Sequence, residues 1–233
     1  MLAYNLLSIA AAGMSTYATG VDSAARISEQ LSCHARDGLD LAGDAAYVWG
    51  SNFLLPSAAD CCSACARHAA ICGAADGSGA GKVYFEYDWK RANGEGKRRK
   101  LRCPAVGRQK RGGCNAWIWC SGRDSPVPGQ CFSFDIHVHK QGECWLKHES
   151  NVTAPIAAGP VLPRAMLAAP RKEWPWAVAP HVWPPEHPPA RLNWVSGVVA
   201  PRSASVWRHV RTPGWQKRFC NKHQCEPGDV RKE

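Results

Sequence analysis

Residues 56–68 have the sequence PSAADCCSACARH, which predicts a short helix that carries three cysteines. Ser57 is a good N-cap, an aspartate three residues later can return the capping interaction, and alanines fill the body of the helix. Cys61 and Cys65 are four residues apart and share one face of this helix. Cys62 points about 100° away from Cys61, so it needs a partner in a different direction.

After this helix, residues 114–120 (CNAWIWC) alternate as a strand does. Trp117 and Trp119 would face one side, and Ala116 and Ile118 the other. Two further segments predict strands: residues 130–139, with Phe132, Phe134, Ile136 and Val138 on one face, and residues 143–148 (ECWLKH). One cysteine-bearing helix followed by several short strands predicts a small α+β domain.

The cysteines are concentrated in one part of the chain. Ten of the twelve fall between Cys33 and Cys144, so this stretch is about 9% cysteine, a density typical of a disulfide scaffold. Disulfides persist where the medium is oxidising, which predicts a secreted or cell-surface protein and argues against a cytosolic enzyme. The composition excludes a multipass membrane protein, a coiled coil and a collagen-like chain.

The N-terminal segment supports this compartment. Residues 1–20 (MLAYNLLSIAAAGMSTYATG) have an apolar centre, and Ala18 and Gly20 satisfy the small-residue rule for cleavage after Gly20, so we expect a signal peptide. An uncleaved anchor and an ordinary buried helix are the alternatives, because no Lys or Arg lies near Met1. No other segment approaches the length of a membrane span. Asn151 begins an Asn-Val-Thr sequon, a potential glycosylation site.

The net charge of +10 lies in two segments. Residues 73–113 carry eleven Lys and Arg against four Asp and Glu, and residues 164–233 carry twelve against five. The runs KRRK (97–100) and RQKR (108–111) resemble nucleic-acid patches, but they lack the interleaved aromatic residues that stack on bases. In a secreted protein we instead expect an anionic polysaccharide, an acidic glycoprotein or lipid head groups as their partner. A solvated loop is the simpler interpretation.

The helix SAADCCSAC, the strand CNAWIWC and the strand CWLK together resemble the PAN/Apple domain, in particular its double-cysteine variant common in green-algal proteins. The resemblance covers residues 33–148. It implies one helix packed on a curved antiparallel sheet, and a module that binds protein or carbohydrate. It also implies the disulfides Cys61–Cys144 and Cys65–Cys114, which leave Cys33–Cys62 and Cys120–Cys131 as the simplest further pairs.

Residues 73–113 depart from the family pattern, because the helix normally runs almost directly into the CNAWIWC strand. We expect a mobile basic insert loop here, since Gly, Lys and Arg at this density do not form a core. Cys72 and Cys103 could close it as a separate loop, or Cys72 could take the role of Cys114. Residues 150–233 hold thirteen of the seventeen prolines and six of the eleven tryptophans, which predicts a mostly irregular extension. Its tryptophans would dock on the domain or contact a partner.

No residue pattern predicts catalysis, a cofactor or a metal. His137 and His139 would share one face of a strand, which is more simply a solvated face than a zinc site. Cys220 and Cys225 flank His223 in half of a zinc knuckle, and a local disulfide is the simpler interpretation in a secreted chain.

The sequence therefore predicts a non-catalytic, secreted or cell-surface module that recognises a carbohydrate or glycoprotein. Trp117, Trp119 and Trp145 are the candidate ligand contacts, with core packing as the alternative role of these rings. The alternative function is a structural component of a cell wall or matrix, which assembles through protein contacts of the domain and of the Trp- and Pro-rich extension.

Overall fold

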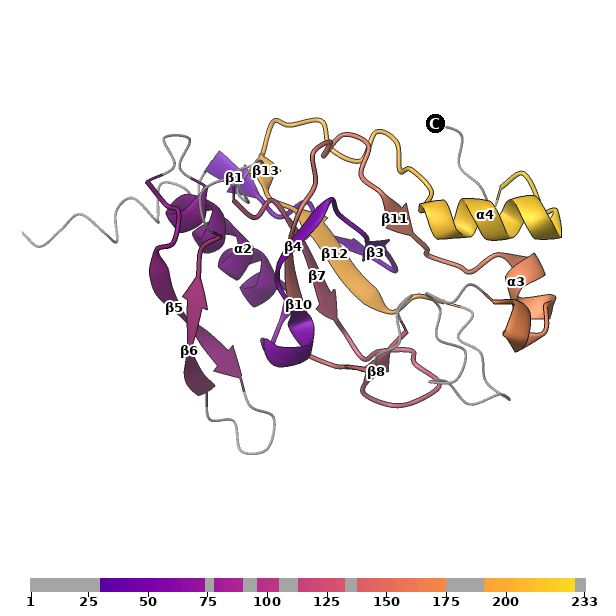
Figure 1. Ribbon diagram of the computed structural model, residues 1–233, viewed down its shortest axis with the longest axis horizontal. Coiled ribbons are helices and arrows are strands. Elements are labelled where there is room, and N and C mark those ends of the chain that lie inside the picture. Colours follow the sequence, from indigo (N-terminus) through magenta and orange to yellow (C-terminus); the bar gives the residue numbers. More distant parts are fainter. Residues whose placement is uncertain are drawn as a thin grey trace, which may run out of the picture.

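The computed structural model describes residues 30–73, 78–89, 96–104, 113–132, 138–174 and 191–228. It shows a disulfide-rich protein in which helices combine with antiparallel sheets, so the α+β prediction is confirmed at this level (Figure 1). The expected signal peptide lies outside the described residues. None of the helices that are described is long and apolar enough to cross a membrane.

Helix α2 (Ala58–Cys72) begins where the sequence predicts. The Ser57 hydroxyl accepts the backbone N–H of Asp60 at 3.1 Å and donates to the Asp60 carboxylate at 2.5 Å. The helix continues four residues past the predicted end at His68, because Ala69, Ala70 and Ile71 extend the helix-forming run. It ends at Gly73, whose N–H donates to the carbonyl of Ala69.

A five-stranded antiparallel sheet lies against this helix, in the order β2-β12-β7-β10-β4. Its strands are β2 (Arg36–Asp37), β4 (Ala45–Val48), β7 (Ala116–Cys120), β10 (Cys144–His148) and β12 (Trp194–Val198). The predicted strands at 114–120 and 143–148 are thus the central pair β7 and β10, with Trp145 opposite Ile118.

Shorter pairs of strands and two 3₁₀ helices surround this sheet. The pairs are β1 (Leu31–Ser32) with β13 (Ala200–Pro201), β3 (Asp40–Leu41) with β11 (Ala157–Ala158), and β8 (Gln130–Cys131) with β9 (His139–Lys140). The 3₁₀ helices are η1 (Gly50–Asn52) and η2 (Arg171–Glu173). Because Cys131 and His139 are antiparallel partners, they belong to two different short strands, and the prediction of one strand over 130–139 is wrong. Residues 133–137 lie outside the described residues. A period of two does not distinguish one long strand from two short ones.

Both faces of the central sheet are covered. Trp117 belongs to the core under α2, whereas Ala116 and Ile118 belong to a second core on the opposite face, which confirms the predicted alternation of β7. This second core also contains Leu41 of β3 and Ala157 of β11. The sheet is therefore the middle layer of the molecule.

All twelve cysteines lie in the described residues and are paired. The disulfides are Cys33–Cys62, Cys61–Cys144, Cys65–Cys114, Cys72–Cys103, Cys120–Cys131 and Cys220–Cys225. They coincide with the pairs expected above, and the alternative in which Cys72 takes the role of Cys114 is wrong. Helix α2 supplies four of these cysteines, so it is cross-linked to the N-terminal segment, to the sheet and to the segment that ends at Cys103.

The basic insert is not simply a loop. Strands β5 (Val83–Trp89) and β6 (Gly96–Arg102) form an antiparallel hairpin in continuous register, which we call the basic hairpin. Its Tyr84 and Leu101 are buried in the core under α2. We expected a loop because of the high content of Gly, Lys and Arg. A strand, however, can carry cations on its outer face while alternate residues pack inward. Residues 74–77, 90–95 and 105–112 lie outside the described residues.

The C-terminal part is mostly irregular, as expected, but it is not a separate extension either. Strand β12 lies between β2 and β7 and pairs with β7 from Trp194 opposite Cys120 to Val198 opposite Ala116. A boundary at 148–150 is therefore wrong, because the sheet is incomplete without residues 194–198. The chain also forms helix α3 (Arg164–Ala168) and helix α4 (Gly214–His223). Strand β12 was not predicted from the sequence, because it is only five residues long and prolines surround it.

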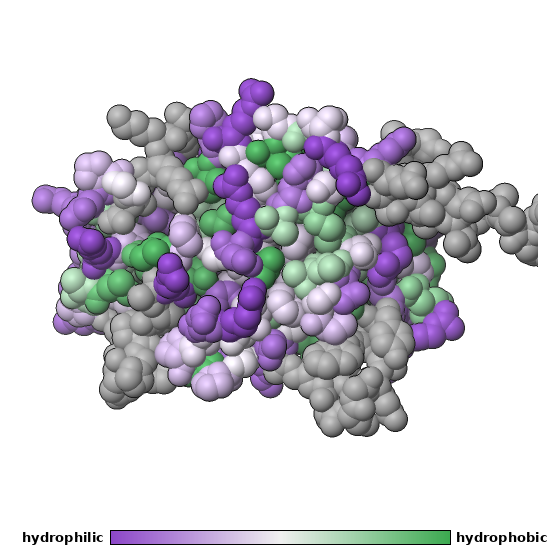
Figure 2. Space-filling model, turned by 180° about the vertical axis from the view of Figure 1, so that it is seen from behind, coloured by the Kyte–Doolittle hydropathy of each residue, from purple (hydrophilic) through white to green (hydrophobic). Residues whose placement is uncertain are grey.

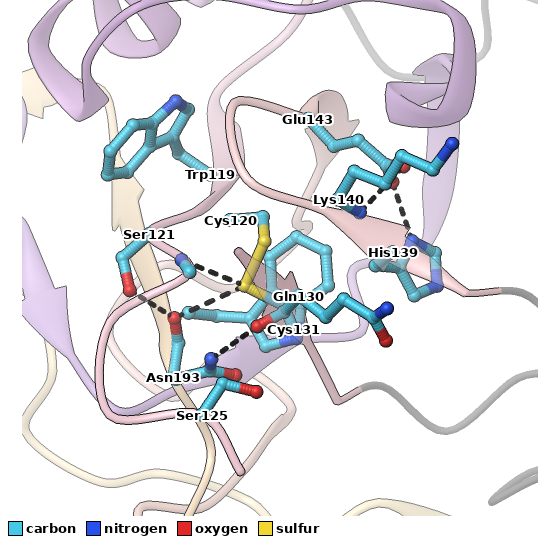
Figure 3. Close-up of a disulfide and its surroundings, with 12 residues drawn as sticks. Trp119, Cys120, Ser121, Ser125, Gln130, Cys131, His139, Lys140, Glu143 and Asn193 are labelled. Carbon is cyan, nitrogen blue, oxygen red and sulfur yellow. Dashed lines mark hydrogen bonds and ion pairs between the residues drawn. A yellow bond between two sulfur atoms is a disulfide. The ribbon is translucent and has the colours of Figure 1, made fainter. Parts of the chain in front are cut away.

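The entry to β12 is fixed by Asn193, close to the Cys120–Cys131 disulfide (Figure 3). The Ser121 hydroxyl donates to the Asn193 carbonyl at 2.6 Å. The side-chain amide of Asn193 donates to the Gln130 carbonyl at 2.7 Å, and its oxygen accepts the N–H of Phe132 at 3.2 Å. Segments more than sixty residues apart are thus joined at this end of the sheet.

Candidate binding surface

The basic hairpin is held to α2 by three kinds of contact. The Cys72–Cys103 disulfide joins the end of α2 to the residue that follows β6. Arg67 of α2 donates two hydrogen bonds to the carboxylate of Glu86, at 2.8 and 2.7 Å. Tyr84 and Leu101 fill the space beneath, and burial raises the pKa of Tyr84. The hairpin therefore presents its outer face from a fixed base.

That outer face carries a row of cations. Arg98, Lys100 and Arg102 alternate along β6, so they lie on one side of the strand about 7 Å apart. All three side chains are exposed, and no carboxylate whose side chain is described forms an ion pair with them. Phe85 of β5 lies opposite Lys100 and is 54% exposed.

The Arg98 guanidinium lies 4.6 Å from the centroid of the Phe85 ring, a cation–π distance. We call Arg98, Lys100, Arg102 and Phe85 the hairpin row. Positive charges spaced evenly beside an exposed ring suit a polymer that alternates anionic groups with flat apolar surfaces. Figure 2 shows that hydrophilic and hydrophobic residues are interspersed over the rear of the molecule.

The three tryptophans that the sequence offered as ligand contacts belong to the core instead. Trp117 is 1% exposed, and Trp145 is 7% exposed. Trp119 is half-buried, and its indole N–H donates to the carbonyl of Leu55 at 2.9 Å. Their strands are central in a sheet that is covered on both faces, so neither face of β7 and β10 is open to a ligand.

An exposed aromatic residue lies beside Trp145: it is Trp49, which was not among the candidate ligand contacts predicted from the sequence. It is 58% exposed, and its ring lies 5.1 Å from that of Trp145. Gly50 permits this packing, because a Cβ at that position would collide with the indole nitrogen of Trp145. Trp49 directly follows strand β4 at the edge of the sheet, and the Trp-Gly pair after a short alternating run is the signal that could have identified it.

The histidines fit structural roles. His139 is 1% exposed rather than on a solvated face, and its Nδ1 lies 2.6 Å from the Glu143 carboxylate (Figure 3). His223 stacks on Phe219 rather than joining the bonded Cys220 and Cys225 in a metal site. Within the described ranges, no group of three or more His, Cys, Asp or Glu residues could hold a metal ion. His137 lies outside the described residues.

A shallow cleft of about 230 Å³ opens beside the entry to β12. Its lining includes Asp37, Arg123, Asp124 and Arg191, so positive and negative groups balance. Arg123 and Asp37 lie 3.6 Å apart, and both are well exposed. Because its charges balance, this cleft favours neither an anionic nor a cationic ligand, whereas the hairpin row favours an anionic one.

The sequon residue Asn151 is exposed in a turn. Its side-chain oxygen accepts the N–H and the hydroxyl of Thr153, at 3.1 and 2.7 Å. The side chain is thus accessible to solvent, and its glycosylation stays a prediction.

Comparison with models of known protein families, with curated proteins and with solved structures gives no match for this chain.

Proposed function

We propose that this protein is a non-catalytic binding module of the PAN/Apple type, secreted or at the cell surface, whose ligand is an anionic polysaccharide. The observation that carries this proposal is the hairpin row on its cross-linked base. The family assignment rests on the sequence resemblance, and it is supported by one long helix disulfide-bonded to an antiparallel sheet.

The chemistry of the row favours a sulfated or carboxylated glycan. Three exposed cations, none of them in an ion pair with a described carboxylate, attract a polyanion through screened Coulomb forces, and the exposed Phe85 ring can pack on a sugar ring. Six disulfides support an oxidising compartment, where polysaccharides rather than nucleic acids are the abundant polyanions. The exposed Asn151 sequon is compatible with the same compartment.

The alternative of assembly through the C-terminal tryptophans has less support. Trp174, Trp194 and Trp207 are each at least 93% buried, so they stabilise the protein itself and offer little surface to a partner. Trp176 and Trp183 lie outside the described residues.

Affinity chromatography on immobilised heparin tests the proposal. We expect Arg98→Gln/Lys100→Gln/Arg102→Gln to elute at a much lower salt concentration than the wild type. A matched control, Lys140→Gln/Arg202→Gln/Arg208→Gln, removes the same charge from exposed residues elsewhere and should elute close to the wild type. Equal shifts for the two variants would mean that net charge alone binds heparin, and the proposed function would be wrong.

A further inference from the structure

Part of the second basic segment lies far from the hairpin. Figure 1 shows β5 and β6 toward one end of the longest axis of the molecule, and α3 and α4 toward the other. Residues 164–233 carry as large an excess of positive charge as the insert segment does. The fold therefore places the cations of α3 and α4 at a distance from those of the basic hairpin.

Helix α4 presents part of this charge in a fixed arrangement. Arg218 and Lys222 are exposed and one helical turn apart, so they share a face. Lys222 lies 3.7 Å from Glu173, which places the neighbouring Lys172 beside the same end of the helix. We call Lys172, Arg218 and Lys222 the α4 patch.

The base of the α4 patch is packed into a core, as is that of the hairpin. Phe219 and Cys220 of α4 pack into a core with Met166 of α3 and Trp174 after η2. The Cys220–Cys225 disulfide closes the C-terminal end of α4. The cations thus project from an anchored helix, and one partly exposed carboxylate, Glu173, offsets part of their charge.

We infer that the protein is bivalent: the hairpin row and the α4 patch each bind a separate anionic polysaccharide chain, so that one molecule bridges two chains. This inference rests on the proposed function for its first site and adds the second. Charge complementarity selects the same class of ligand at both sites. A short oligosaccharide cannot reach from one end of the molecule to the other, so the two sites fill independently.

Calorimetry with a heparin hexasaccharide, and light scattering with long heparin chains, test bivalency. We expect two hexasaccharides per wild-type protein, and a scattering maximum when protein and long heparin are mixed near equal charge, because bridged chains form a network. Lys172→Gln/Arg218→Gln/Lys222→Gln should bind one hexasaccharide and lose the scattering maximum. The charge-retaining variant Lys172→Arg/Arg218→Lys/Lys222→Arg should behave as the wild type, provided that circular dichroism shows all variants folded.

The outcomes separate the two proposals. If the Gln variant of the α4 patch still binds two hexasaccharides and scatters as the wild type, or if the wild type binds only one, bivalency is wrong while hairpin binding stands. If the hairpin variant instead binds as the wild type, the proposed function is wrong. A wild type that binds two hexasaccharides without scattering would overturn bridging, because both sites would then engage one chain.

Discussion

His68 illustrates how single residues are adapted to the core of this protein. Its side chain is 2% exposed, it stacks on Tyr47 at 4.8 Å, and its Nδ1 accepts the backbone N–H of Cys114 at 3.0 Å. Burial lowers the pKa of His68 to about 4. The imidazole is therefore neutral in the folded protein at pH 6, where an unfolded chain would already bind protons at this residue.

We predict that this residue makes the protein less stable in mild acid. The pKa of His68 is lower in the folded protein than its unfolded value of 6.5, so the unfolded chain takes up a proton at this residue first. Above pH 6.5 the folded protein keeps its full stability, and the unfolding free energy falls as the pH is lowered from 6.5 toward 4. The full loss is about 3 kcal/mol at most. His68→Asn keeps an acceptor for the Cys114 N–H without the titration, so the fall in unfolding free energy between pH 7 and pH 4.5 should be smaller.

Denaturant unfolding at several pH values measures this difference. Glu149 titrates in the opposite sense, because burial raises the pKa of its carboxyl, so the comparison is made between the two proteins and not on the wild type alone. If the two curves of stability against pH are parallel, the role given to His68 is wrong.

At the scale of elements, the contact between α2 and the basic hairpin decides how the hairpin row is presented. The Glu86 side chain is 3% exposed and accepts both hydrogen bonds from Arg67, whose own side chain is 52% exposed. A buried carboxylate that loses its cation is costly, although solvent around the arginine reduces the effect. The hydrogen bond to Glu86 also raises the pKa of Arg67.

We predict that Arg67→Ala lowers the unfolding free energy by about 2 kcal/mol, because the Glu86 carboxylate is left buried without its partner. Arg67→Ala/Glu86→Gln should recover part of this loss, since it removes the uncompensated charge. Urea unfolding gives both values, and Arg102→Ala is the control for losing an exposed arginine. A loss no larger for Arg67→Ala than for Arg102→Ala would contradict the assignment.

For the molecule as a whole, cross-links and long-range strand pairing keep the two charged ends in place. Four disulfides bond helix α2 to other segments of the chain. Strand β12, from the C-terminal part of the chain, pairs with β2 and β7 in the central sheet. The hairpin at one end and the helices at the other are thus part of one disulfide-bonded fold around the central sheet (Figure 1). The proposed bivalent binding uses this connection, because the folded core spaces the two charged ends.

We predict that Cys72→Ser/Cys103→Ser is about as damaging as Cys61→Ser/Cys144→Ser. The disulfides join residues 31 and 83 positions apart, for which loop-closure entropy gives about 4 and about 5 kcal/mol. The control Cys220→Ser/Cys225→Ser removes a disulfide between residues only 5 positions apart, and it should lower the unfolding free energy by about 2 kcal/mol. Thermal unfolding ranks the three variants, and a Cys72→Ser/Cys103→Ser variant as stable as the control would mean that the hairpin lies outside the core.

Local features of the sequence determined the start of α2, the strands β7 and β10, and the cysteine pairs. Capping depends on residues three positions apart and alternation on neighbouring residues, whereas the pairs Cys61–Cys144 and Cys65–Cys114 were implied by the resemblance of the cysteine motifs to a known family. Each of these signals is contained within a few residues, so it can be read without knowing where the rest of the chain lies.

Only the tertiary structure decided which surface is free to bind. Trp117 and Trp145 look like ligand contacts until α2 covers one face of the sheet and Leu41 and Ala157 cover the other. The sequence of the hairpin predicts a loop. Only the packing of Tyr84 in the core under α2 and the hydrogen bonds between Glu86 and Arg67 show that the hairpin is attached to the helix. Pairing of Trp194 with Cys120 joins residues more than seventy positions apart, and its free energy comes from burial that no local pattern encodes.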